Sequence, residues 1–131
     1  MTTRRLISVT VFCIYLTGVL YLCFARPDDI PQLPELWFGL PSDKAGHFLM
    51  FLPFPLLGCM AFENYGMGIS KKLVVLAVLI AAGIGIAAGT EHIQGILGYR
   101  STESSDLLAD GVGLFCGGIV CMIHILTKKS R

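Results

Sequence analysis

Charged residues are few in this sequence. Only 15% of the 131 residues are Asp, Glu, Lys or Arg, whereas 54% are hydrophobic, and the formal net charge is +1. A soluble domain is typically about one quarter charged, so this composition argues against that class. The near-neutral balance also lacks the basic surface on which nucleic-acid binding depends, and we expect no nucleic-acid partner.

The sequence also lacks cysteine pairs and a recognisable nucleophile motif. No CxxC occurs, and a disulfide framework would place cysteine pairs in loops. All five cysteines lie instead within apolar runs: Cys13, Cys23, Cys59, Cys116 and Cys121. No Gly-x-Ser-x-Gly motif is present. We therefore predict no disulfide framework and no cofactor, and we assign no metal site.

Long apolar runs dominate what is present. A bilayer core of roughly 30 Å needs about 20 helical residues, and lipid admits only helices or closed barrels. None of the runs has the period-2 pattern of a barrel strand. We predict one domain over residues 1–131, an all-α membrane protein with a bundle of four transmembrane helices. The predicted spans are about 6–24, 46–62, 73–90 and 107–126.

Basic residues are distributed unevenly among the loops. Lys and Arg concentrate on the cytoplasmic side of membrane proteins. They mark the N-terminus, the second loop and the tail: Arg4, Arg5, Lys71, Lys72, Lys128, Lys129 and Arg131. We therefore predict that both termini are cytoplasmic and that the first and third loops face outward.

Small residues recur at intervals of four in the last two spans. Gly85 and Gly89 form one stripe, and Gly113 and Gly117 form another. Such spacing lets helix backbones approach closely in lipid. We predict that the third and fourth helices pack together along these stripes. Homodimerisation through one stripe is the alternative.

Two prolines, Pro53 and Pro55, interrupt the second span. Each removes a backbone hydrogen bond, so we predict a kink below His47. The kink makes room for an acyl or prenyl chain, or it fits the helix around its neighbours.

Polar side chains gather at the outer ends of three spans. Their spacing of three or four residues puts each pair on one helical face. The pairs are Asp43 with His47, Glu91 with Gln94, and Asp106 with Asp110, and Arg100 lies in the third loop. Ionisable groups at this depth are costly and usually functional. We expect them to converge in one pocket in the outer leaflet.

These residues carry a family resemblance. "SDKAGHF", residues 42–48, resembles the D-K-x-x-H-F motif of VanZ-like membrane proteins. "EHIQGILGYRSTESSDLLADGVG", residues 91–113, is similar to that family's E-x-x-Q, R and D-x-x-x-N-x-x-G pattern. The pattern more often has Asn where this chain has Asp110. The resemblance implies a bacterial cytoplasmic (inner) membrane, an outward functional face and a link to teicoplanin resistance.

Three interpretations of the polar residues stay open. In the first, the site binds an anionic headgroup of a membrane lipid or lipid-linked cell-wall precursor. The ligand-binding residues are then Lys44, Gln94, Arg100, Asp106 and Asp110.

In the second interpretation the protein is an enzyme, a hydrolase or transferase acting on a lipid-linked envelope substrate. His47 pairs with Asp43, Glu91 or Asp106 for general acid–base catalysis, and the catalytic set is His47, Asp43 and Glu91. The same acids with His47 are also plausible ligands for a divalent cation. In the third interpretation the charges are only an ion-pair network that joins helix ends.

Overall fold

The computed structural model describes residues 1–25, 36–37, 39–64, 66–98 and 104–128. Four helical segments are long and apolar enough to cross a membrane, which confirms the predicted all-α bundle. The first is α1 (Thr3–Phe24), and the second is divided into α2 (Ser42–Phe51) and α3 (Pro53–Phe62). The third and fourth are α4 (Ile69–Leu97) and α5 (Ser104–Lys128). A small antiparallel ribbon, β1 (Leu36–Trp37) with β2 (Leu40–Pro41), precedes α2.

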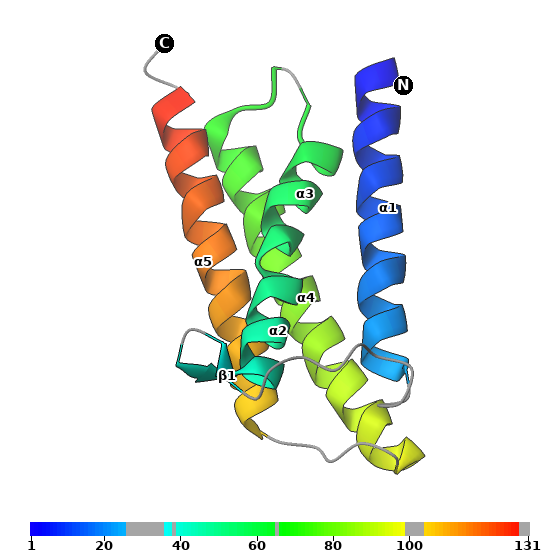
Figure 1. The fold of residues 1–131 in the computed structure, drawn as a ribbon. Helices are drawn as coiled ribbons and strands as arrows, with labels where there is room; N and C mark the ends of the chain where they lie inside the picture. The colour runs from blue at the N-terminus through cyan, green and yellow to red at the C-terminus, as the bar shows by residue number, and fades with distance from the viewer. Residues whose placement is uncertain (26–35, 38, 65, 99–103, 129–131) are drawn as a thin grey trace.

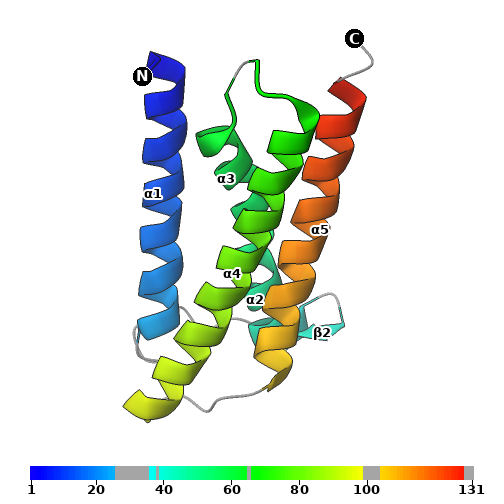
Figure 2. The ribbon, with the colours of Figure 1, turned by 180° about the vertical axis from the view of Figure 1, so that it is seen from behind.

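Both ends of the chain lie at the same end of the bundle. Figures 1 and 2 show the N-terminus of α1 and the C-terminus of α5 together, with the first turns of α2 and α5 at the opposite end. Four consecutive spans require this arrangement, since each one returns the chain across the bundle. That the shared end faces the cytoplasm stays a prediction from loop charge.

The third span is longer than the apolar run predicts. Helix α4 has 29 residues, so it is about 43 Å long at 1.5 Å per residue and exceeds a bilayer core of roughly 30 Å. Its last turns contain polar residues, which ended the predicted span at residue 90. Glu91 and Gln94 therefore lie on the helix itself.

The second span is divided at the prolines, as predicted. Pro53 opens α3, and Leu52 between the two helices keeps a right-handed helical conformation with φ −56° and ψ −45°. The Leu52 amide donates to the Phe48 carbonyl at 3.0 Å, so the chain stays nearly helical through the break.

The α2–α3 junction is covered by α5. A Cβ on Gly113 would lie 2.5 Å from the Phe48 carbonyl oxygen, and one on Gly117 would meet the Leu52 carbonyl oxygen. Helix α5 thus packs on this junction backbone to backbone. Of the two roles considered for the kink, these contacts favour fitting the helix around its neighbours, because α5 occupies the space at these positions.

The predicted glycine pairing between α4 and α5 is wrong. The two helices do pack together, but a Cβ added at Gly85 or Gly89 would meet no neighbouring atom within 4 Å. The close approaches involve Gly83 against Leu114, and Gly118 against Ile80. Small-residue spacing therefore identified Gly113 and Gly117 as closely packed without identifying their partners, and it also selected Gly85 and Gly89, which are open.

Candidate functional site

Two helices bring the polar cluster together at the end of the bundle away from the chain termini. Helix α2 supplies Asp43, Lys44 and His47 from its first two turns, and α5 supplies Asp106 and Asp110. These two acids lie on the α5 face that continues into Gly113 and Gly117. Because those glycines let α5 approach α2 closely, the acids one and two turns earlier reach across to it. We call these five side chains the α2–α5 cluster.

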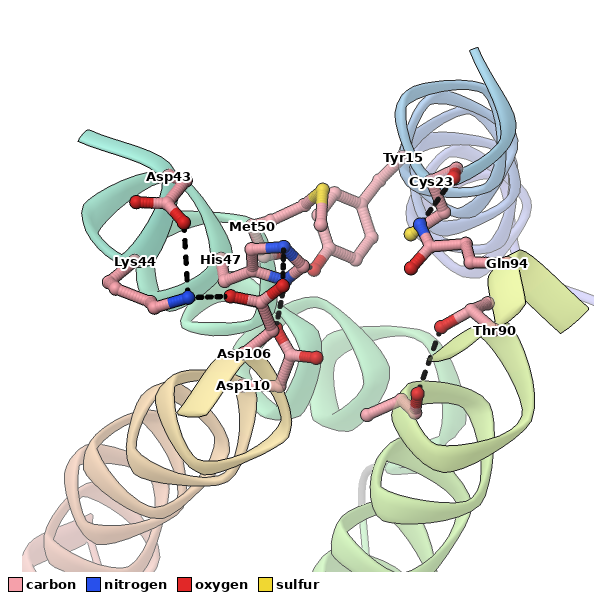
Figure 3. Close-up of polar contacts among 11 residues, drawn as sticks. Tyr15, Cys23, Asp43, Lys44, His47, Met50, Thr90, Gln94, Asp106 and Asp110 are labelled. Atoms are coloured by element: carbon pink, nitrogen blue, oxygen red, sulfur yellow. Dashed lines mark hydrogen bonds and ion pairs between the residues drawn. The ribbon is translucent and has the colours of Figure 1, made fainter. Parts of the chain in front are cut away.

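The centre of the cluster is a buried histidine–carboxylate pair. His47 Nδ1 lies 2.8 Å from Asp110 Oδ1, and its Nε2 lies 3.7 Å from Asp106 Oδ2 (Figure 3). His47 is 7% exposed and Asp110 only 2%. Asp110 therefore orients the imidazole.

Lys44 joins the buried pair to the outside of the cluster. Its ammonium group donates to Asp106 Oδ1 and, at 3.0 Å, to Asp43 Oδ2 (Figure 3). The Asp43 side chain is 54% exposed, against 12% for Asp106 and 20% for Lys44. Among the described residues, Lys44 consequently has one buried and one exposed carboxylate partner.

The inner part of the cluster is close to electrical balance. Among the described residues, the Lys44 ammonium group faces the Asp106 carboxylate, and one proton shared by His47 and Asp110 leaves that second pair without net charge. Asp43 and Asp106 also lie in the first turns of their helices, where the helix dipole stabilises negative charge. Asp43 is the surplus anion, and it is the member most open to solvent.

Gln94 belongs to a helix contact outside the cluster. Its amide donates to the Cys23 carbonyl in the last turn of α1, and the side chain is buried. The last carbonyls of a helix need partners from outside the helix, and Gln94 supplies one here. Figure 3 shows the Gln94 amide nitrogen bonded to Cys23 on α1.

Glu91 lines a separate pocket on the α4–α5 side, together with His92 and Leu107. Arg100 lies outside the described residues. The predicted convergence of three helix ends thus holds for two helices among the described residues, with Asp43, Lys44, His47, Asp106 and Asp110 brought together.

Within the described part of the chain, no group of three or more His, Cys, Asp or Glu side chains is arranged to hold a metal ion. The carboxylates of the cluster bond instead to Lys44 and His47.

Sequence reasoning missed Tyr15 on α1. Its hydroxyl donates to the Met50 carbonyl on α2, close to the cluster in Figure 3. Met50 lies just before the proline break. A tyrosine within an apolar run is the signal that was available, because a buried hydroxyl usually finds a partner.

The cluster offers two kinds of chemistry. The Lys44 ammonium is a cation with an exchangeable exposed partner, which suits an anion. The His47–Asp110 pair can accept or give up a proton, which suits general acid–base catalysis.

Comparison with known proteins gives one family and one relative. The family model of VanZ/LLP1 matches residues 11–126. An uncharacterized protein of Schizosaccharomyces pombe is 24% identical over 123 residues, which are 94% of this chain and 65% of that protein. The chain thus spans about two thirds of that relative's length. No solved structure matches.

Proposed function

This chain belongs to the VanZ/LLP1 family, and we propose that it is a multi-pass membrane protein that binds an anionic lipid headgroup at the α2–α5 cluster. The single observation that carries the proposal is the pairing of Lys44 with one buried and one exposed carboxylate. Asp43 then acts as a stand-in for the ligand. A phosphate or carboxylate headgroup replaces it at the ammonium group, while Asp106 keeps Lys44 in place.

Charge and location support this exchange. Asp43 is largely solvated, so its bond to Lys44 contributes little and is readily given up. The first turns of α2 and α5 lie at the cluster, and helix N-termini favour anions. Replacing Asp43 by a headgroup leaves the inner balance of Lys44 and His47 against Asp106 and Asp110 unchanged.

Two substitutions with opposite expected effects test the proposal. Lys44→Gln removes the cation and should weaken binding of dioctanoyl phosphatidic acid by roughly tenfold or more, as expected for a lost charge-assisted hydrogen bond. Asp43→Asn removes the competing anion and should tighten binding. Binding is measured by the ligand-dependent rise in melting temperature in detergent, with dioctanoyl phosphatidylcholine as the zwitterionic control.

The two variants also separate binding from a purely structural role. A structural ion-pair network predicts that Asp43→Asn lowers stability slightly and leaves lipid affinity unchanged. If Asp43→Asn does not tighten binding, or if Lys44→Gln binds the acidic lipid as well as the parent, the headgroup proposal is wrong.

The proposal extends to the cell envelope. Loop charge predicts that the cluster faces outward, where a bacterial inner membrane presents lipid-linked cell-wall precursors with anionic headgroups. We therefore propose these precursors as ligands, and a contribution to teicoplanin resistance as the consequence. Bacteria that produce the chain should survive higher teicoplanin concentrations than bacteria that produce Lys44→Gln at equal membrane levels.

The His47–Asp110 pair favours a second candidate function, hydrolysis or transfer on a lipid-linked substrate. A histidine oriented by a buried carboxylate is the arrangement of a general acid–base. Asp110→Asn keeps the size and part of the hydrogen bonding but removes the carboxylate that can exchange a proton with the imidazole. Loss of turnover of a lipid pyrophosphate with retained phosphatidic acid binding would favour catalysis over binding alone.

A further inference from the structure

We propose that a groove between α4 and α5 holds one hydrocarbon chain of a membrane lipid, with the lipid's polar end beside Glu91 and His92. The groove has a volume of about 490 Å³, within the roughly 300–1,000 Å³ of small-molecule pockets. We call it the α4–α5 groove. Figure 2 shows the two helices that form it side by side.

The groove is built from a buried floor and exposed walls. Ala87 and Leu114 on the floor are each 1% exposed. Ile84, Leu108 and Phe115 on the walls are 50%, 68% and 68% exposed. Because both helices are membrane spans, these walls face hydrocarbon and an apolar occupant is required.

A second hollow, whose lining includes two ionisable side chains, lies next to the groove. It has a volume of about 420 Å³ and is lined by Glu91, His92 and Gly95, and Leu107 lines both hollows. An apolar groove next to ionisable side chains matches a molecule with a hydrocarbon chain and a polar head. A second copy of the chain is the competing occupant of the groove, and the disulfide test below distinguishes it from a lipid.

The position of the groove across the bilayer fits one lipid chain. On α5 it runs from Ser104 to Phe115, which is about 16 Å at 1.5 Å per residue and half of a core of roughly 30 Å. Glu91 and His92 lie in the last two turns of α4, beyond the apolar part of the groove. One acyl chain of the same leaflet therefore has the required length and direction.

The groove is distinct from the headgroup site. Asp106 and Asp110 face α2, whereas Leu108, Gly111 and Phe115 project from another face of α5. The inference consequently does not rest on the proposed function.

Gly111 gives a direct test. It lines the groove, and a Cβ there would have no atom within 4 Å, so Gly111→Leu fills the groove without a clash. Gly85→Leu is the matched control, because Gly85 is equally open and is not among the lining residues. Both variants are expected to fold.

The probe is a phosphatidylcholine with a diazirine at the middle of one acyl chain, added at low ratio to detergent-solubilised protein. We expect photolabelling to concentrate on the groove walls. Gly111→Leu should reduce labelling roughly tenfold, the change expected when about two methylene groups lose their burial, and Gly85→Leu should leave it unchanged.

Three results would overturn the inference. One is labelling spread evenly over the exposed faces of the bundle, and another is labelling that Gly111→Leu does not reduce. The third is a dimer in which Leu108→Cys forms a disulfide with its copy, since the groove would then be an interface.

Discussion

Asp110 is one of the most buried residues that the structure describes. Its exposed fraction is about as small as those of Phe51 and Leu114. An isolated charge at such a position in a membrane is very costly. His47 Nδ1 at 2.8 Å supplies the partner from the facing helix. The pair therefore fixes how α2 and α5 face each other, because turning either helix would leave a buried polar group unsatisfied.

The two described carboxylate partners of Lys44 are expected to contribute differently to stability. Asp106→Ala removes its buried partner and should cost about 3–5 kcal/mol of unfolding free energy, as for other broken buried pairs. Asp43→Ala removes its exposed partner and should cost at most about 1 kcal/mol. Reversible unfolding in mixed micelles measures both. Equal losses would show that burial does not distinguish the two carboxylates.

Helix α5 combines two functions on one face. Its first turns carry Asp106 and Asp110, and the next turns carry Gly113 and Gly117. The glycines allow backbone contact with the α2–α3 junction, and that contact sets the distance over which the acids reach α2. The packing contact and the polar site thus depend on the same stretch of helix.

Two alanine substitutions test whether the close packing of α5 holds the cluster in place. Gly117→Ala should destabilise the protein and disturb the cluster, because its Cβ meets backbone atoms that cannot move aside cheaply. Gly85→Ala should be neutral or stabilise α4 by up to about 1 kcal/mol from helix propensity. Melting temperatures in detergent give the comparison. A stable Gly117→Ala variant would contradict the close packing of α5.

The two ends of the helix bundle carry different features. The chain termini and the Lys71–Lys72 segment lie at one end, and the α2–α5 cluster and the Glu91–His92 end of the α4–α5 groove lie at the other. Under both proposals, the ligand therefore approaches from one leaflet only. Which leaflet that is depends on insertion, for which loop charge is the determinant.

Cysteine accessibility checks this orientation. In a variant with all five native cysteines replaced, a cysteine at Ser104 should react with an impermeant thiol reagent in intact cells, and one at Ser70 should not. Both positions are exposed and lie at opposite ends of the bundle. Reaction at Ser70 alone would place the cluster on the cytoplasmic side.

The sequence by itself determined the four spans, the family and the polar character of one end. Those features follow from local properties: the length of apolar runs, the position of the prolines, and the order of the D-K-x-x-H-F and later motif residues. Local periodicity also placed Asp106 and Asp110 on one face with Gly113 and Gly117.

Only the tertiary structure decided which partners meet. The sequence offered Asp43, Glu91 and Asp106 as partners for His47, yet Asp110 makes its shortest described contact. Gln94 bonds to Cys23 on α1, and Gly113 and Gly117 pack on the α2–α3 junction and not on α4. Periodicity fixes the face of a helix on which a residue lies. The rotation and distance between helices, which arise from packing the whole bundle, fix what that face meets.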